Sequence, residues 1–200
     1  MQDLDMEMNV FEAILARRSV RSYAAREIDR TQLHTLLEAA VRAPTAMHGE
    51  PWAFAVVQDR HLLQTLSDRA KPLFQEEVRR AGMEEAAGRF LDEFSRPDFN
   101  FFYDAGTLII IGSMATGPFV AADCWLAAEN LMLAACAMGL GTCVVGSVLP
   151  TLGLAEIKSM LGLPDQFSAI APIICGYSRG ESSPASRKKP VVLTNGFAFQ

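Results

Sequence analysis

Residues 127–146 read AAENLMLAACAMGLGTCVVG, and this stretch decides the fold. It belongs to a longer run, from Asn130 to Ala155, that contains no charged residue and is long enough to cross a bilayer. Helix-breaking residues nevertheless divide this run, at Gly139, Gly141, Gly146 and Pro150. This division favours an alanine-rich helix over 120–138, a turn at Gly139 and a strand over 142–145, all buried in a protein core rather than in a membrane. The small residues along the helix permit close contact with another helix, as at the centre of a dimer.

Similar patterns on both sides of this stretch predict the other elements. Asp29 is expected to cap a helix, with Gln32 as its reciprocal partner, and Pro44 to end it. Helices are also predicted over 9–17, 60–70 and near 154–161, and strands over 52–57, 108–111 and 169–175. The strand at 108–111 is too uniformly apolar for a sheet with one solvent face. The expected fold is a layered α+β or α/β domain, in which helices flank a sheet of four or five strands.

Two segments differ from this core within what is predicted to be a single domain, residues 1–200. Residues 72–104 are charged and rich in aromatic side chains, which suggests one or two exposed helices and a loop, forming a lid-like excursion over a site. Its rings either stack on a flat ligand or simply anchor the excursion onto the core. Residues 178–200 are largely polar and contain proline, so this tail is expected to wrap on another surface if it is ordered.

Composition and charge argue against several classes of function. The chain has 200 residues, a net charge of −5 and a pI of about 5.2, which disfavours nucleic-acid binding. The four cysteines form no C-x-x-C pair and the three histidines are dispersed, so we expect reduced thiols and no metal site. No G-x-G-x-x-G motif follows a strand, which disfavours a Rossmann fold. The N-terminal residues lack the pattern of a secretory signal, which predicts a cytoplasmic protein.

A basic cluster near the N-terminus is unusual in so acidic a chain. Residues 16–23 read ARRSVRSY and place three arginines and two serines at the end of the first predicted helix. Guanidinium groups offer planar, paired donors that suit a phosphate or an electron-rich ring edge. The alternative is a solvated charge cluster that follows a surface helix.

Three stretches in order, RRSVRSY at 17–23, APTAMHGEPWAF at 43–54 and the stretch at 127–146, resemble the nitroreductase family. The resemblance runs from about residue 9 to about 190 and weakens over 72–104. It implies an α+β fold with a central, mostly antiparallel sheet and an intertwined homodimer that holds FMN at each of two subunit interfaces. It further implies a ping-pong cycle in which NADH or NADPH reduces the flavin, and an electron-poor acceptor such as a nitroaromatic or a quinone then takes the electrons.

The resemblance also implies which residues bind the cofactor. On the family pattern, the phosphate and the ring edge of FMN are met by Arg17, Arg18, Ser19 and Arg21, and the partner's flavin is reached by Pro44, Thr45, Ala46, His48 and Glu50. The reactive edge of the flavin is expected beside Val145, Gly146 and Ser147, the phosphate again beside Arg187, Lys188 and Lys189, and the ring beside Gln75. No catalytic acid, base or nucleophile is implied, because the flavin carries the chemistry.

The second stretch departs from the family pattern, which is close to P-S-S-x-N-x-Q-P-W. Ala46 lacks a hydroxyl, and His48 and Glu50 replace two amides, so the hydrogen bonds at the ring edge and the preferred acceptor are open. His48 and Glu50 can also be a solvated loop pair. The alternatives are therefore a relative that reduces enoates, removes halogens or breaks down flavin, and a flavin-binding regulator without turnover.

Overall fold

The computed structural model of the chain describes residues 8–94, 96, 98–180 and 186–193. Four strands form one sheet in the order β1–β2–β4–β3, with every neighbouring pair antiparallel. The strands are β1 (Trp52–Val57), β2 (Thr107–Ser113), β3 (Gly141–Val144) and β4 (Ser168–Gly176). This confirms the predicted α+β fold with a mostly antiparallel sheet of four or five strands.

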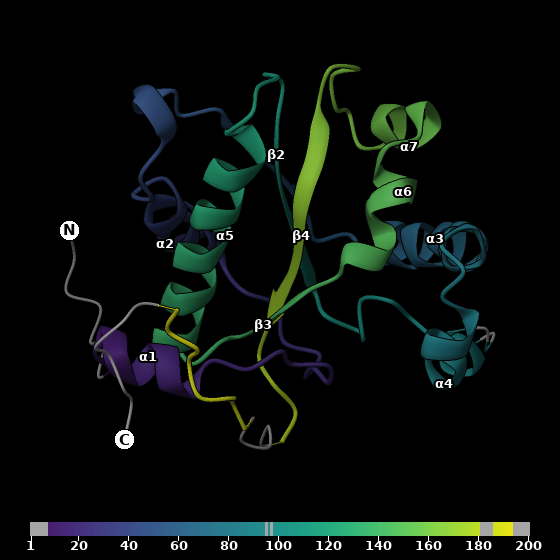
Figure 1. The fold of residues 1–200 in the computed structure, drawn as a ribbon, viewed down its shortest axis with the longest axis horizontal. Helices are drawn as coiled ribbons and strands as arrows, with labels where there is room; N and C mark the ends of the chain where they lie inside the picture. Colours follow the sequence, from purple (N-terminus) through teal and green to yellow (C-terminus); the bar gives the residue numbers. More distant parts are fainter. Residues whose placement is uncertain (1–7, 95, 97, 181–185, 194–200) are drawn as a thin grey trace.

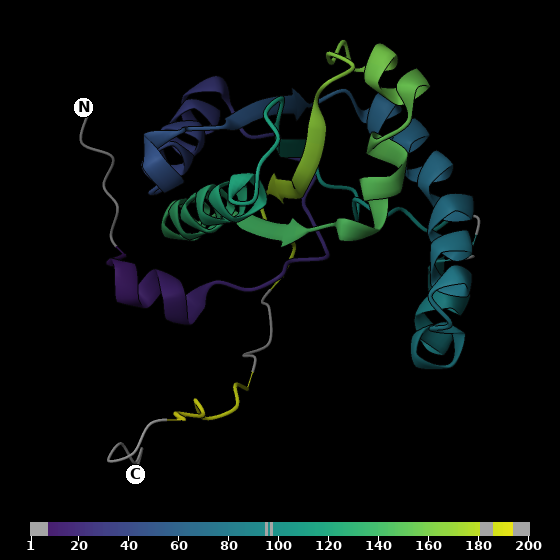
Figure 2. The same cartoon turned by 45° about the horizontal axis from the view of Figure 1, so that its top comes forward.

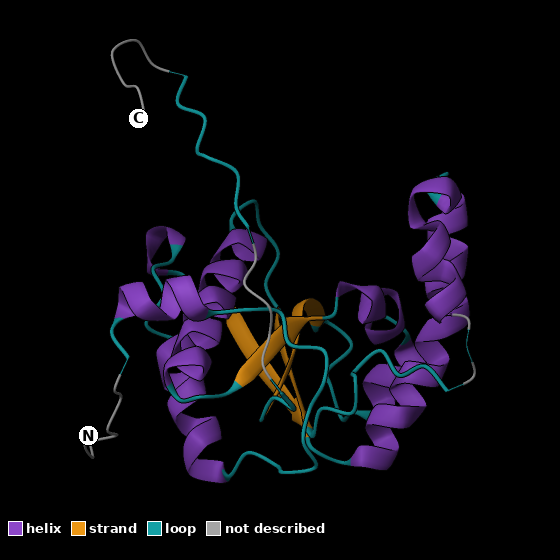
Figure 3. Ribbon diagram, turned by 90° about the horizontal axis from the view of Figure 1, so that it is seen from below, coloured by secondary structure: helices purple, strands orange, loops and turns teal. Residues whose placement is uncertain are grey.

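Helices cover both faces of the sheet (Figure 1, Figure 3). One face carries α2 (Arg30–Ala40) and α5 (Val120–Ala137), with α1 (Val10–Ala16) packed against α5. The other carries α3 (Arg60–Arg80), α6 (Leu149–Leu152) and α7 (Ala155–Met160), while α4 (Glu84–Phe94) extends from α3. Alternate residues of β2 enter two separate cores, Ile109 and Ile111 toward α5 and Leu108 and Ile110 toward α3. This explains why the strand is apolar on both faces.

The helix predicted from the stretch at 127–146 lies in the core. By length and composition α5 could cross a membrane, but in this structure it lies between α2 and the sheet. Its buried side chains are Asp123, Cys124, Ala127, Ala128, Leu131, Met132 and Ala135. Gly139 follows the helix with a φ of 71°, a left-handed conformation that suits glycine after a helix end.

Local signals set most element boundaries, with one clear exception. Asp29 and Gln32 form the predicted reciprocal cap of α2, with N–H···O distances of 2.8 and 3.1 Å. The helix predicted over 60–70, however, continues through Pro72 to Arg80. Its buried stripe, which includes Leu66, Ala70 and Val78, extends past the proline, so tertiary packing outweighs the local preference to stop.

Candidate functional site

The basic cluster is fixed against the edge of the sheet. After α1 ends, Ser19 forms a parallel bridge with Thr142 of the edge strand β3, and the backbone N–H of Val20 donates to the Thr142 carbonyl oxygen at 2.9 Å. Val20 is buried directly over Gly141. The arginines on either side of Val20 are therefore held beside the residues that end α5 and begin β3.

A hollow of about 400 Å³ lies at this junction, and we call it the arginine hollow. Its lining includes Arg17, Arg18, Cys136, Gly139, Thr142 and Gly180. The Arg18 guanidinium donates to the backbone carbonyl of Arg17 at 2.8 Å and to that of Leu15, and so caps the end of α1. Arg17 lies 3.9 Å from the half-exposed carboxylate of Glu129, too far for a hydrogen bond. The positive charge of the hollow is therefore only weakly compensated.

The charge of the arginines acts on the thiol of Cys136, which lines the hollow. Burial raises the pKa of Cys136, while Arg17 and Arg18 lower it by stabilising the thiolate. An anion that enters the hollow would meet the same favourable potential, together with the guanidinium donors.

The strand end beside this segment presents open backbone. The N–H of buried Val145 donates to the carbonyl of Pro172 at 2.9 Å, which continues the sheet one residue past β3. Gly146 is exposed, and a Cβ added there would meet no atom within 4 Å. Ser147 is half-buried. A flat group can therefore lie against the backbone at Gly146.

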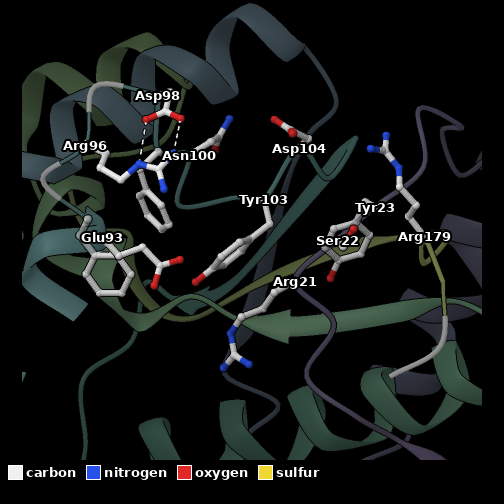
Figure 4. A pocket seen from close by; sticks show the side chains of 12 residues that line it. Arg21, Ser22, Tyr23, Glu93, Arg96, Asp98, Asn100, Tyr103, Asp104 and Arg179 are labelled. Carbon is white, nitrogen blue, oxygen red and sulfur yellow. Dashed lines mark hydrogen bonds and ion pairs between the residues drawn. The ribbon is translucent and has the colours of Figure 1, made fainter. Parts of the chain in front are cut away.

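A second hollow, of about 600 Å³, has Arg21 in its lining, and we call it the tyrosine hollow (Figure 4). Its lining includes Arg21, Glu93, Phe94, Phe99, Tyr103 and Arg179. Burial raises the pKa of Tyr103, and the nearby Arg21 lowers it. The phenol is protonated at neutral pH, as an ordinary tyrosine is, and its O–H is available as a donor. Figure 4 shows the Tyr103 ring extending toward Arg21, with Arg96 and Asp98 paired above it in the view; their closest N···O distance is 2.6 Å.

Aromatic packing supports this hollow. The rings of Phe74, Phe94, Phe99, Phe101 and Tyr103 form a chain of contacts with centroid separations between 4.8 and 5.7 Å. Phe101 and Phe102 are 1% and 0% exposed, so they are core anchors. Tyr103 stands at the edge of the cluster with a φ of 50°, in the left-handed region that L residues seldom adopt. Phe90 is another aromatic residue of the predicted lid-like excursion, and its side chain lies outside the described part of the chain.

The 44–50 loop lies at the N-terminal end of α5, opposite the end that borders the arginine hollow (Figure 1). It contains the short 3-10 helix Ala46–His48, whose first N–H donates to Asp123 in the first turn of α5. From Asp123 to Cys136 the helix rises roughly 20 Å, at 1.5 Å per residue. One subunit therefore does not bring its predicted residues Pro44, Thr45, Ala46, His48 and Glu50 to its own arginine hollow.

This loop has an unusual backbone. Met47, His48 and Glu50 have φ values of 53°, 52° and 41°, and their side chains are exposed. Each such conformation costs roughly 1–3 kcal/mol for an L residue and persists where its surroundings enforce it. Strain on exposed residues points to a shape kept for function rather than for packing.

The remaining predicted residues lie elsewhere. Gln75 is half-buried on α3, beside Phe74, and is not part of the described lining of either hollow. Arg187, Lys188 and Lys189 are exposed in a segment, 186–193, that leads away from the body of the fold (Figure 2, Figure 3). Among the described residues, no group of three or more His, Cys, Asp or Glu side chains is placed to hold a metal ion.

The structure adds two residues that sequence reasoning did not assign to the site, Asp123 and Cys136. Both were visible in the sequence, as a lone acid before an apolar run and as a cysteine within it. Their roles depend on contacts between segments far apart in the chain, for which the sequence holds no local signal.

Comparisons with known proteins identify the family of this chain. The nitroreductase family model matches residues 14–177. An NADH dehydrogenase of Thermus thermophilus is 30% identical over 190 residues, which cover 88% of this chain and 89% of the relative. An iodotyrosine deiodinase of Thermotoga neapolitana is 25% identical over 94% of this chain and 98% of its own.

A solved structure supports the same assignment. The crystal structure of a nitroreductase with bound FMN from Bacteroides fragilis is 27% identical, with a TM-score of 0.73, and the match covers 96% of this chain and 98% of that one. The family model itself spans most of the 200 residues, including the arginine segment and β3. This chain therefore belongs to the nitroreductase family.

Proposed function

We propose that this chain is an FMN-dependent NAD(P)H oxidoreductase that works as a homodimer. The observation that carries the proposal is the docking of the arginine segment on β3, which unites two of the three family-like stretches at one place. There, the arginine hollow, the open backbone at Gly146 and the guanidinium of Arg21 lie along one edge of the sheet. The arginine hollow would suit an anionic tail, the backbone at Gly146 a flat ring, and the Arg21 guanidinium an electron-rich ring edge.

The residues at this edge fit FMN. Arg17, Arg18 and Ser19 would hold the phosphate, since guanidinium groups and a hydroxyl give charge-assisted donors to its oxygens. Gly146 would leave room for the ring, because it has no side chain there. Arg21 would contact the pyrimidine edge, where a positive charge favours the anionic reduced form. The basic residues at 187–189 would add to the phosphate site if the tail returns to it.

Bound FMN would supply the hydride and electron transfer. The protein would contribute position and electrostatics, by fixing the ring against β3 and by placing Arg21 at its edge. NADH or NADPH would stack on the exposed ring face and leave before the acceptor enters. Because these donors and reduced thiols belong to the cytoplasm, we place the protein there.

A second subunit would complete the site. The 44–50 loop lies at the far end of α5 from the arginine hollow, so a two-fold partner is the natural source of the loop for each flavin. Apolar side chains cover the outer surface of α1, where Phe11 and Leu15 are 75% and 73% exposed. α5 adds Trp125 and Leu126, and such a surface is expected to be covered by another chain. The tail at 178–200 would wrap onto the partner.

The acceptor would enter the tyrosine hollow, next to Arg21. Flat electron-poor molecules such as nitroaromatics and quinones suit its mixture of aromatic rings and a hydroxyl donor. Residues 72–104 would then act as the lid that selects acceptors. Dehalogenation is the second candidate, because the Thermotoga relative is named for that reaction and this chain departs from the family pattern at His48 and Glu50.

The proposed function is tested by identifying the bound cofactor and following its reduction. The protein is purified, the bound cofactor is released and identified by mass spectrometry, and the absorbance of the protein is followed anaerobically with NADH or NADPH. We expect a yellow protein that is bleached by one of the donors and recovers its colour with a nitroaromatic or a quinone. A colourless protein that also fails to take up added FMN would show that the arginines are a solvated cluster. A coloured protein that no donor bleaches would be a flavin-binding regulator.

A further inference from the structure

Asp123 joins the 44–50 loop to the protein core. The residue lies in the first turn of α5 and is only 5% exposed. Its two carboxylate oxygens lie 3.2 and 3.3 Å from the backbone nitrogen of Ala46, whose N–H they accept. A carboxylate is favoured at the N-terminus of a helix, and its hydrogen bond to an N–H is stronger than one between neutral groups.

The loop has little else to hold it. Its other hydrogen bonds are internal, from the Gly49 N–H to the Ala46 carbonyl at 3.0 Å and from the Glu50 N–H to the Thr45 hydroxyl at 3.4 Å. Thr45 precedes the 3-10 helix without capping it through its side chain. Within the described residues, the hydrogen bond from Ala46 to Asp123 is therefore the one that ties residues 44–50 to another element.

The strained part of the loop follows this anchor directly. Met47, His48 and Glu50 all have positive φ values and exposed side chains, so packing does not enforce their conformation. A strained backbone persists only where the surrounding structure holds it in place. Asp123 fixes one end, from a buried position that does not itself reach the loop surface.

We propose that Asp123 is a positioning residue, which holds the 44–50 loop in the shape that meets the flavin of the partner subunit. The inference rests on the proposed function for the identity of the bound group, but the contact itself lies within one chain. Asp123 touches neither cofactor nor acceptor and acts through the N–H of Ala46. The simpler alternative is that Asp123 only stabilises the start of α5 through its charge.

Three variants separate these roles. Asp123→Ala removes the acceptor and the charge, whereas Asp123→Asn removes the charge and keeps a carbonyl oxygen for the Ala46 N–H. Ala46→Pro removes the donor from the loop side and leaves α5 unchanged. Ala46 begins the turn that the Gly49 N–H closes by donating to the Ala46 carbonyl, its own N–H makes no bond within that turn, and Thr45 has the extended conformation that a residue before proline prefers. The matched control is Thr107→Val. It removes a buried hydroxyl that accepts a hydrogen bond from the Gln58 side chain at 3.1 Å, and Thr107 is the first residue of β2, away from the 44–50 loop.

Two readouts are used, and the first needs no flavin. Hydrogen–deuterium exchange on the FMN-free dimer reports how well the amides of residues 46–50 are protected, and FMN titration reports the dissociation constant. We expect Asp123→Ala to lose protection across the loop and to weaken FMN binding about tenfold, whereas Asp123→Asn stays within about threefold of the wild type. Ala46→Pro should weaken FMN binding as much as Asp123→Ala does. The double variant Ala46→Pro/Asp123→Ala should bind FMN no more weakly than either single variant, because both remove the same hydrogen bond. Thr107→Val should lower the stability of the protein but leave its affinity for FMN unchanged.

Each other outcome is informative. Equal losses in Asp123→Asn and Asp123→Ala would assign the residue to the helix dipole and overturn the proposal. Faster exchange in Asp123→Ala with unchanged FMN affinity would also overturn it, because the loop position would then not matter to the cofactor. If Asp123→Ala does not fold, the comparison of Ala46→Pro with Asp123→Asn decides the same question. Failure of the wild type to bind FMN would refute the proposed function, while the exchange data would still test the contact.

Discussion

The N–H of Val20 donates to the carbonyl oxygen of Thr142 at 2.9 Å, which sets the chain after α1 directly on the sheet edge. The close approach depends on Gly141, because a Cβ on this residue would lie 2.7 Å from Cγ2 of Val20. A separation below about 3 Å between carbon atoms is far inside their contact distance of roughly 3.5–4.0 Å. Gly141 thus allows the chain to place Arg17 and Arg18 in the arginine hollow and Arg21 in the tyrosine hollow.

Gly141→Ala should therefore displace Val20 and the arginine segment. We expect the free energy of unfolding to fall by about 1–3 kcal/mol, as in an overpacked core, and FMN affinity to fall with it. Adding Val20→Ala removes the two methyl groups that would lie 2.7 and 3.0 Å from the new Cβ and leaves the Val20 Cβ at 2.9 Å, so the double variant should recover part of the FMN affinity, beyond the sum of the single effects. Gly153→Ala is the matched control, since its Cβ would lie an ordinary 3.4 Å from the Pro150 carbonyl oxygen. Additive effects of Gly141→Ala and Val20→Ala would refute the steric argument.

Arg17→Ala and Arg21→Ala should each weaken FMN binding without unfolding the protein. Each removes a charge-assisted contact worth about 1.5–3 kcal/mol, or roughly one to two decades in dissociation constant. Arg60→Ala serves as the control, because this half-exposed arginine pairs with Glu27 at 3.6 Å, away from the arginine hollow. Flavin fluorescence titration and thermal unfolding measure the two properties. Unchanged affinity in both site variants would favour the solvated-cluster interpretation of the arginines.

Local signals in the sequence were enough to predict most of the fold. The glycines after α5, the capping box at Asp29 and the apolar strand over 108–111 each act within a few residues, and the structure confirms all three. The predicted end of the helix near residue 70 was wrong, because the buried stripe that continues α3 past Pro72 to Arg80 is defined only by the folded core. The bounds of α3 therefore needed tertiary information.

The candidate site was less predictable for the same reason. The family-like stretches indicate which residues are candidates for the site. The sequence around them does not reveal that the 44–50 loop and the arginine hollow lie at opposite ends of α5. The bond between Asp123 and Ala46 joins residues on different elements, and neither residue has a distinctive local pattern. Contacts of this kind follow from the packing of α5 on the sheet and are visible only in three dimensions.

Phe11→Glu should convert the protein to a monomer and release its flavin. A charged side chain at this 75% exposed position would change the stability of an isolated chain by less than about 0.5 kcal/mol, but it cannot be buried unpaired in an interface. Met83→Glu is the control, because Met83 is 54% exposed on the turn between α3 and α4, on the other side of the sheet. Sedimentation equilibrium measures the mass of each variant. A Phe11→Glu dimer that retains FMN would exclude α1 from the interface.

Tyr103→Phe should slow the acceptor half-reaction selectively. The phenol is protonated at neutral pH, so its O–H can donate to a nitro or quinone oxygen in the tyrosine hollow. Loss of one such bond costs about 0.5–1.5 kcal/mol, or roughly two- to tenfold in the rate with acceptor, while the ring contact with Phe99 remains. Reduction by NADH or NADPH and the thermal midpoint should stay close to those of the wild type. Stopped-flow measurement of the two half-reactions separates these rates.

The contrasting variant is Phe102→Ala, since Phe102 is fully buried in the core that the same segment enters. Its loss should lower the free energy of unfolding by about 3–5 kcal/mol and slow both half-reactions together. The two variants therefore divide the aromatic residues of 72–104 into those that select the acceptor and those that hold the segment in place. If Tyr103→Phe slows both half-reactions equally, or neither, the tyrosine hollow does not receive the acceptor. Acceptor choice would then depend on His48 and Glu50, whose strained loop is the other exposed part of the proposed site.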